Sequence, residues 1–383
     1  MSAKILVVDD EPDLEHLVRQ KFRRHIRDNE FEFVFAQNGV QALQCLQNDG
    51  TIDLVLTDIN MPEMDGLTLL TKMKELHMPL LRSVIVSAYG DMENIRTAMN
   101  RGAYDFVIKP IDLADLEITI NKSLDDLFKL KEAIQSRDQL VALHHELDIA
   151  RTIQMSLLPK TFPDRFELDI YAEMTPAKEV GGDFYDFFLI DENRLGFSIG
   201  DVSGKGVPAA LFMAVCKTVL KSTALKGLSP DECLHQVNRM LQLESVASMF
   251  VTVFYGILDI STGEIVYCNG GHLPPYKISK DGKANAIEIT GNLVLGVFAN
   301  ASYQTKTIQL APGDGLLLYT DGITEAMGPH NEEYGEERLN HSLQVPIKSA
   351  KETTQTLIDS VKNFSGGRAQ SDDMTVLTLY YRS

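Results

Sequence analysis

The stretch 4–11, KILVVDDE, leads from a short apolar run directly into two adjacent aspartates, Asp9 and Asp10. Continuous apolar runs that alternate with amphipathic helical stretches are typical of a parallel sheet covered on both faces. The first 125 residues show this pattern and are predicted to form a doubly wound α/β domain of flavodoxin-like type with five parallel strands. The expected strands lie at 5–8, 33–36, 53–57, 84–87 and 106–108.

Polar side chains stand at the carboxyl ends of these predicted strands, where ligands of doubly wound domains bind. Carboxylates crowded at one edge repel one another unless a cation compensates them, and a hard ion such as Mg2+ prefers oxygen ligands. A lysine and a serine would supply the charge and the hydroxyl that a phosphoryl group needs. A solvated loop explains any one aspartate equally well, whereas the whole set indicates a site. The set is Asp9, Asp10, Asp58, Ser87 and Lys109.

Four segments of this region resemble the receiver domain of two-component response regulators, over residues 4–125. They are KILVVDDE (4–11), DLVLTDINMPEMDG (53–66), VIVSAYG (84–90) and GAYDFVIKP (102–110). The resemblance implies that Asp58 is the phosphoacceptor and that a cognate histidine kinase is the partner that phosphorylates it. We therefore assign 1–125 to a receiver domain.

The same resemblance implies roles for the other strand-end residues and a Mg2+ cofactor. The ion would be bound by Asp10, Asp58 and the main-chain carbonyl of Asn60, with Asp9 in support. Ser87 and Lys109 would hold the phosphoryl oxygens, Phe106 would be the switch residue, and the Lys109–Pro110 peptide bond would be cis.

A heptad-like series of apolar residues without Gly or Pro runs from Leu113 to Leu157. Such a series predicts one long helix, either as a parallel dimeric coiled coil or as an intramolecular helix packed on its neighbours. We assign 126–158 to a helical coiled-coil linker that forms a homodimer, and Pro159 ends it. The seam is Leu113, Leu116, Ile120, Ser123, Leu127, Leu130 and Ile134, then Leu140, Leu143, Leu147, Ala150 and Leu157 with a one-residue offset.

The remaining segment, 159–383, has a different pattern. Two helical stretches, 209–223 and 230–244, lie among β-like runs and glycine-containing loops. Strands in groups and helices in groups predict an α+β fold, a β-sandwich flanked by helices, rather than a βαβ series. The expected strands include 195–199, 250–258, 316–319 and 374–380.

Four acidic motifs are spread over this segment, each with an acid beside glycine or at a strand end. Glycine lets the backbone approach an ion closely, and oxygen-only donors favour Mg2+ or Mn2+ over zinc. Two such ions together can activate a water and neutralise a phosphoryl group. A lone loop aspartate is commonly a cap or turn residue, so the inference rests on the four together. The motifs are EVGGDFYD (179–186), GDVSGKG (200–206), YTDG (319–322) and SDDMT (371–375).

With ELDIARTIQMSLLP (146–159) and NGGHLPP (269–275), these motifs resemble the PPM-type serine/threonine phosphatases of the SpoIIE and RsbU branch, over 146–383. The resemblance implies two Mn2+ or Mg2+ ions and a catalytic set of Asp183, Asp201, Asp321 and Asp372. Asp201 would bridge both ions and the Val202 carbonyl would bind one. Asp321 and Asp372 would complete the other site, and Asp183 would act directly or through water. Asp373 is the alternative to Asp372, which aligns with the first residue of the family motif.

Two further residues of these motifs have two possible roles each. His272 lies either near the substrate or in a structural turn, and Lys205 either meets a phosphate or is a solvated loop lysine. The sequence shows no clear counterpart of the phosphate-binding arginine of eukaryotic relatives. The metals would then hold most of the substrate phosphate.

The amino-acid composition narrows the classes of partner that the protein is expected to bind. The chain has 36 Lys and Arg against 54 Asp and Glu, a net charge of −18, which disfavours nucleic acid and anionic membranes. Four cysteines without a CxxC pair suggest neither zinc nor disulfides. An N-terminus with aspartates at 9 and 10, and no run of 18 apolar residues, predict neither a secretory signal nor a membrane span. We expect a cytoplasmic protein.

Together these patterns predict a response regulator whose phosphatase output is controlled by phosphorylation of Asp58. The family resemblance implies a phosphoserine or phosphothreonine protein as substrate, usually a STAS-type anti-sigma-factor antagonist, and thereby regulation of a sigma factor. The main alternative is a catalytically inactive adaptor that binds a sigma factor or its regulator. Its signature would be loss of the metal aspartates, and all of them are present. A DNA-binding regulator is disfavoured because no basic recognition helix is found.

Overall fold

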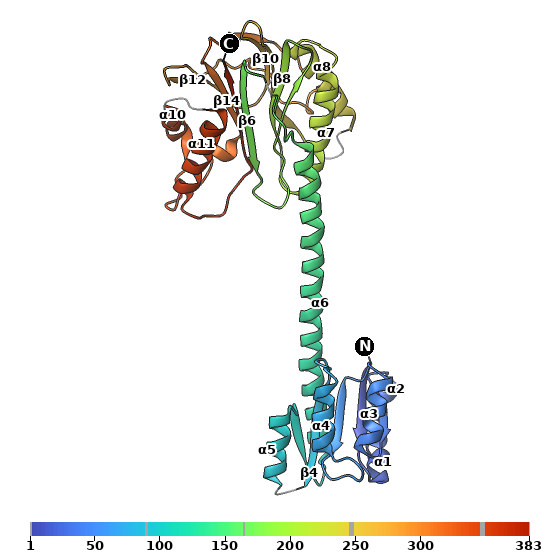
Figure 1. Ribbon diagram of the computed structural model, residues 1–383. Helices are drawn as coiled ribbons and strands as arrows, with labels where there is room; N and C mark the ends of the chain where they lie inside the picture. Colours follow the sequence, from blue (N-terminus) through green and yellow to red (C-terminus); the bar gives the residue numbers. More distant parts are fainter. Residues whose placement is uncertain (1, 89–90, 164, 245–248, 345–348, 383) are drawn as a thin grey trace. The chain divides into compact units, whose positions relative to one another are not determined.

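The computed structural model describes residues 2–88, 91–163, 165–244, 249–344 and 349–382 of the 383-residue chain. Its internal contacts divide the chain into two compact units, Met1–Leu143 and His144–Ser383. Figure 1 labels the helices and strands of both units. Tyr89 and Gly90, the last residues of the motif at 84–90, lie outside the described residues.

The first unit contains a five-stranded parallel sheet in the order β2-β1-β3-β4-β5. The predicted doubly wound α/β domain is therefore confirmed. The central strands are buried along their length because helices cover both faces of the sheet. The strands are β1 (Ala3–Val8), β2 (Phe31–Ala36), β3 (Leu54–Asp58), β4 (Arg82–Ala88) and β5 (Asp105–Lys109).

Helices pack on both faces of this sheet. One face carries a core with Val18, Phe22 and Ile120, and the other face one with Ala42 and Leu69. The helices are α1 (Pro12–Lys21), α2 (Arg23–Arg27), α3 (Gly39–Asn48), α4 (Gly66–Glu75), α5 (Met92–Arg101) and the first part of α6 (Leu113–Leu157).

The long predicted helix exists as α6, but its two halves differ in burial. Leu116, Ile120 and Leu124 lie in the core of the first unit, and Leu127 is fully buried. This half of the heptad series is thus an intramolecular helix, the second of the two alternatives. Farther along the helix, several apolar side chains are exposed, and the coiled coil stays a prediction for this half. They are Leu130, Leu140, Val141, Leu143, Ile149, Ile153 and Leu157.

The second unit contains two antiparallel five-stranded sheets, which confirms the predicted β-sandwich flanked by helices. One sheet has the order β13-β10-β9-β8-β7 and the other β12-β11-β14-β15-β6. The first consists of β7 (Phe184–Leu189), β8 (Arg194–Val202), β9 (Val251–Asp259), β10 (Glu264–Gly270) and β13 (Lys306–Gln309). The second consists of β6 (Leu168–Thr175), β11 (Tyr276–Ile278), β12 (Ala284–Ala286), β14 (Gly315–Tyr319) and β15 (Met374–Tyr381).

Helices cover the outer faces of the two sheets (Figure 1). α7 (Val207–Ala224) and α8 (Pro230–Glu244) pack on the first sheet, and α10 (Gly335–Leu343) and α11 (Ala350–Ser365) lie with the second. The short α9 (Asp321–Thr324) follows β14. Among the described helices, only α7 is long and apolar enough to cross a membrane, and its buried residues pack in the core between β7, β8 and α8.

Candidate functional site

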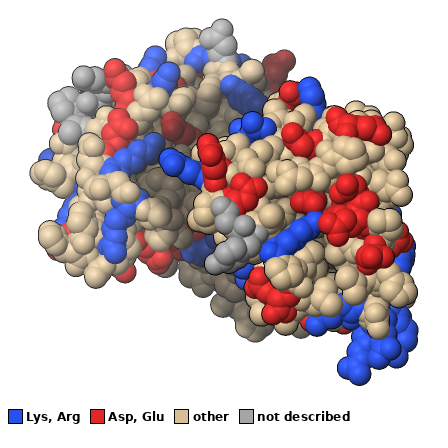
Figure 2. Space-filling view, turned by 90° about the horizontal axis from the view of Figure 1, so that it is seen from below, with Lys and Arg blue, Asp and Glu red and all other residues tan. Residues whose placement is uncertain are grey.

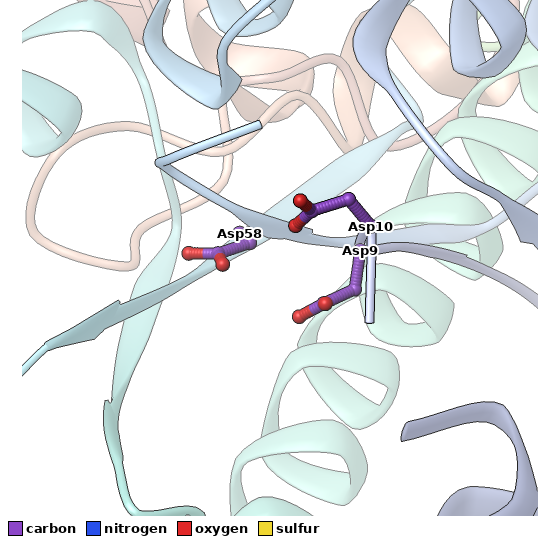
Figure 3. A group of neighbouring side chains, drawn as sticks. All are labelled: Asp9, Asp10 and Asp58. Atoms are coloured by element: carbon purple, nitrogen blue, oxygen red, sulfur yellow. The ribbon is translucent and has the colours of Figure 1, made fainter. Parts of the chain in front are cut away.

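Three carboxylates meet at the carboxyl edge of the parallel sheet. Asp58 ends β3, and Asp9 and Asp10 follow β1, whose Val8 pairs with Thr57 of β3. Each offers an oxygen that lies within 4.8 Å of the other two, and Figure 3 shows all three extending to one side. Asp9 and Asp58 are buried, whereas Asp10 is exposed. Oxygen donors that converge in this way fit a hard cation such as Mg2+.

Lys109 compensates part of this negative charge. Its Nζ lies 2.7 Å from Asp58 Oδ2 and 3.1 Å from Asp9 Oδ2. Burial opposes the ammonium charge, but the hydrogen bonds and attraction of Asp58 and then Asp9 outweigh it and raise the pKa of Lys109. Burial is also the main reason why the pKa of Asp9 is raised. Lys109 therefore stays charged beside the phosphoacceptor position.

Ser87 sits near the end of β4 with a hydroxyl that is ready for a ligand. Its Oγ is buried and has no hydrogen-bond partner among the residues that the structure describes. An unpaired buried hydroxyl is costly, and a phosphoryl oxygen would satisfy it. Phe106 is half-buried against a small cluster that includes Ala98, and the Lys109–Pro110 bond is cis, as the resemblance implies.

In the second unit, Asp183 is almost completely buried at the start of β7. Thr320 Oγ1 and Thr375 Oγ1 both donate to its Oδ2, at 2.7 and 2.6 Å. Burial, followed by repulsion from Asp201 and Asp373, raises the pKa of Asp183 well above its usual value. The two threonines fix the position of the carboxylate but leave its charge uncompensated.

Asp201, in β8, is half-buried and is repelled by neighbouring carboxylates, as Asp183 is. Burial, then the charges of Asp321 and Asp372, raises the pKa of Asp201 to about 7. Asp321 starts α9, and burial and then Asp372 raise its pKa as well. Desolvated carboxylates that repel one another are the arrangement that a divalent cation relieves.

The neighbouring residues Asp372 and Asp373 differ in burial and in the partners of their carboxylates. The Asp373 carboxylate is buried and accepts backbone N–H bonds from Ala177 at 2.8 Å and Gly182 at 2.6 Å. Asp372 is partly exposed and pairs with Lys205 Nζ at 2.7 Å. The carboxylate of Asp373 is therefore already bound by backbone N–H groups. The carboxylate of Asp372 pairs with Lys205, which a metal ion could replace. Lys205 also donates to Ser371 O, so it is not a free loop lysine.

The phosphatase aspartates form a looser group than the receiver aspartates. Among the described residues, only Asp9, Asp10 and Asp58 bring three ligand atoms within 4.8 Å of one another. The second group is instead linked by the electrostatic effects that its members exert on one another's pKa. Asp183, Asp201, Asp321 and Asp372 thus lie near enough to influence one another's ionisation, and their role as metal ligands stays a prediction.

His272 has a structural position. It is buried, its Nδ1 accepts from Thr252 Oγ1 at 2.8 Å, and its Nε2 donates to Tyr319 O at 3.1 Å. Burial lowers the pKa of His272 to about 4, so it stays neutral. The imidazole braces β9 beside Asp201 against the end of β14 before Asp321. Of the two predicted roles, the structural one holds.

Sequence reasoning did not identify Thr320, Thr375, Glu325 or Gln154. The threonines stand inside the quoted motifs, and Glu325 lies four residues after Asp321, so proximity to a predicted metal-site aspartate was the available signal. Burial and then Asp321 raise the pKa of Glu325. Gln154, in α6, exchanges two hydrogen bonds with Gly181: Nε2 donates to O at 2.6 Å, and Oε1 accepts from N at 3.1 Å. No local pattern marks this long-range contact.

Comparisons with known proteins match each of the two units to a family. A family model described as Stage II sporulation protein E (SpoIIE) matches residues 191–382, and one described as response regulator receiver domain matches 5–121. The phosphoserine phosphatase RsbU of Bacillus subtilis is 32% identical over 242 residues, 61% of this chain and 69% of RsbU. Protein IcfG of Synechocystis sp. is 31% identical over 262 residues. That alignment covers 61% of this chain but only 41% of IcfG.

Among solved structures, the SiaA-PP2C domain of Pseudomonas aeruginosa superposes with a TM-score of 0.58 at 20% identity. The match covers 63% of this chain and 98% of that domain. The similarity at this identity shows a shared PP2C fold for the C-terminal unit.

Proposed function

The chain belongs to the SpoIIE family of protein serine/threonine phosphatases and carries a response-regulator receiver domain, and from this we propose that phosphorylation of Asp58 controls the hydrolysis of a phosphoprotein. The observation that carries the proposal is the continuity of α6. Its start is buried in the receiver core, and its Gln154 is hydrogen-bonded to the turn that precedes Asp183. The same helix thus contacts the core of the receiver and the turn that precedes Asp183.

In the receiver, Asp58 would accept the phosphoryl group from a cognate histidine kinase. Lys109 already lies against Asp58 and remains charged, and the unpaired hydroxyl of Ser87 would donate a hydrogen bond to an oxygen of the new phosphoryl group. Asp10, Asp58 and the carbonyl of Asn60 would hold Mg2+, with Asp9 beside them. The ion would supply the charge compensation that the carboxylates lack.

In the phosphatase unit, two Mn2+ or Mg2+ ions would be held by Asp201, the Val202 carbonyl, Asp321 and Asp372, with Asp183 in support. Bound there, the metals would supply an activated water and neutralise phosphoryl charge. Thr320 and Thr375 keep Asp183 in place, and Asp373 holds the loop that bears Asp372. The contrast between the two neighbouring acids favours Asp372 as the ligand.

We propose a phosphoserine or phosphothreonine protein as the substrate, and a STAS-type anti-sigma-factor antagonist as its class, with sigma-factor activity as the regulated output. RsbU, which is named a phosphoserine phosphatase, supports the first part. The proposal places the protein in the cytoplasm, and all four cysteines are free, as a reducing compartment would require. The exposed apolar residues of α6 beyond Leu130 support a homodimer.

The one-residue offset in the series near Leu140 is our proposed point of change in α6. Because Leu127 and Lys131 still contact the receiver, the segment free to respond begins after them. Replacing 132–142 by an ideal heptad spacer of equal length should lock the phosphatase in one activity state. Regulation that persists with the spacer would exclude this segment as the point of change.

Hydrolysis of para-nitrophenyl phosphate by the full chain tests the proposed function directly. We expect turnover that requires Mn2+ or Mg2+, disappears in Asp201→Asn, and changes when beryllofluoride mimics phosphorylation of Asp58. Turnover that survives in Asp201→Asn would come from another enzyme. No turnover with either metal would favour the inactive adaptor, and an activity indifferent to beryllofluoride would remove the receiver from control.

A further inference from the structure

A cavity of about 170 Å3 opens next to the proposed metal site, between α9, α11 and the loop that precedes Asp372. Gly322 and Ser371 line it, and these are the chain neighbours of Asp321 and Asp372. Gly322 also packs against the main chain of residues 372–373. The wall of the cavity is therefore the same backbone that carries two of the proposed metal ligands.

Two cationic side chains line the cavity. Lys362, on the last turns of α11, and Arg368, in the following loop, both line it and are exposed. Lys362 has no ion-pair partner within the described part of the chain. In a chain with a net charge of −18, two uncompensated cations beside a group of carboxylates are an unusual local reversal of charge.

The guanidinium of Arg368 is held in place without a carboxylate. Its Nη1 donates to Gly328 O at 2.6 Å, and its Nη2 donates to Asn331 Oδ1 at 2.8 Å. These two bonds fix the plane of the group and leave other N–H donors available. A guanidinium that is positioned but not neutralised is a ready partner for an anion.

The loop that forms the remaining wall is also fixed. α11 ends at Gly366 and Gly367, whose φ angles of 58° and 85° turn the chain in the left-handed region. Gln370 Nε2 then donates to Thr175 O at 2.8 Å and to Asp372 O at 2.6 Å. The cavity is consequently pre-formed, and its distance from Asp372 is set by the main chain.

We propose that this cavity binds an acidic side chain of the phosphoprotein substrate, close in sequence to the phosphorylated residue, through Lys362 and Arg368. The inference rests on the proposed phosphatase activity and adds a specificity determinant to it. An extended peptide advances about 3.3 Å per residue, so a side chain within two positions of the phosphoserine can reach from the metal site into the adjoining cavity. Substrates with glutamate or aspartate at these positions would be preferred.

The test compares three synthetic phosphoserine peptides with the Mn2+-loaded full chain. They carry glutamate, alanine or lysine at the two positions on each side of the phosphoserine. We expect the wild-type kcat/KM to be highest for the glutamate peptide, through a lower KM. In Lys362→Glu, the glutamate-to-alanine preference should fall by about fivefold, the size of one exposed charge pair, and the lysine peptide should gain. Arg368→Gln should weaken the same preference.

Lys226→Glu is the matched control, because Lys226 is exposed in the same unit but lies outside the cavity lining, and it should keep the wild-type ranking. Equal loss on all three peptides in Lys362→Glu would mean that the cavity holds the phosphoryl group or stabilises the fold, and would overturn the proposal. A wild type that ranks the peptides equally would do so too. If wild type cleaves para-nitrophenyl phosphate but shows no ranking, only this inference fails. If it cleaves neither, the proposed function fails with it.

Discussion

The receiver and the phosphatase unit each contain a cluster of aspartates whose charges repel one another, and the two clusters differ in how this repulsion is compensated. In the receiver, Lys109 contacts both buried carboxylates, Asp9 and Asp58, at the edge of the sheet. In the phosphatase unit, Lys205 pairs with the partly exposed Asp372, and burial together with neighbouring carboxylates raises the pKa values of Asp183 and Asp201. The receiver thus carries its own counter-charge, whereas the phosphatase group requires protons or metal ions.

The largest expected effect tests this dependence through Asp201. Asp201→Asn keeps the side-chain shape but removes the charge at the centre of the proposed metal site. Because even supporting residues of metal sites contribute about 10–100-fold to activity, we expect a loss of at least about 100-fold in kcat/KM for para-nitrophenyl phosphate. Asp10→Asn is the counterpart in the receiver and should leave metal-dependent hydrolysis within the range of the unphosphorylated wild type. Similar losses in both variants would erase the distinction between the two groups.

A second effect concerns how the stability of the folded phosphatase unit depends on pH. The folded-state pKa of Asp201 is raised from 3.8 to about 7, so between these pH values the folded protein holds a proton that the unfolded chain does not. This contribution to stability is complete below about pH 4 and is lost as the pH rises to about 7. We expect the thermal transition of the phosphatase unit, measured by calorimetry after chelation, to fall over that interval.

Excess Mn2+ should remove this fall, because the metal replaces the proton as the compensating charge. Asp201→Asn should make the profile shallower in chelated protein, since an amide does not titrate, while Asp183 and Asp321 keep part of the pH dependence. A wild-type profile that is flat without metal would contradict the raised pKa.

The two lysines provide a matched pair of substitutions. Lys109→Met leaves Asp58 and Asp9 buried without a cation, and we expect it to cost about 1–3 kcal/mol of receiver stability. Lys205→Met breaks a pair in which Lys205 is 47% exposed, and an exposed pair contributes about 0–1 kcal/mol. Urea unfolding of the full chain without added metal would measure both. A larger cost for Lys205→Met would reverse the comparison.

The smallest expected effect on hydrolysis concerns Gln154, which connects α6 to the turn before Asp183. Gln154→Leu leaves the N–H and carbonyl of Gly181 unpaired, a penalty of about 1–3 kcal/mol borne by the turn before Asp183. We expect a higher Mn2+ requirement for hydrolysis and a weaker response to beryllofluoride. Thr152→Val on the same helix, whose hydroxyl bonds only to Asp148 O, should change neither. Unchanged metal requirement in Gln154→Leu would separate α6 from the site.

The sequence predicted the parts of the fold that depend on local pattern. Strands such as β1 and β3 follow apolar runs that end in chemically unusual residues, and the aspartate motifs identify both sites. β11 and β12 were missed because three residues carry too little periodicity. The heptad series predicted α6 correctly but not which neighbour buries its first half, because an apolar face does not identify its partner.

Other features could not be found without the three-dimensional contacts. The different uses of Asp372 and Asp373 depend on the backbone N–H groups of residues nearly two hundred positions away, such as Ala177 and Gly182. The cavity beside Ser371 arises where α11, α9 and a loop converge, and no one segment encodes it. Roles assigned from the family to individual metal ligands remain predictions that the substitutions above address.

The close seating of Asp373 makes two glycines irreplaceable. A Cβ on Gly181 would collide with the carboxylate of Asp373, and a Cβ on Gly322 would collide with its main-chain oxygen. A single methyl group at either position would act as a wedge, driving the loop with Asp372 away from the turn before Asp183 on one side or from Asp321 on the other. The distances between the acidic residues thus depend on the lack of a Cβ at these two glycines. Alanine, the mildest of substitutions elsewhere, would be among the most damaging here.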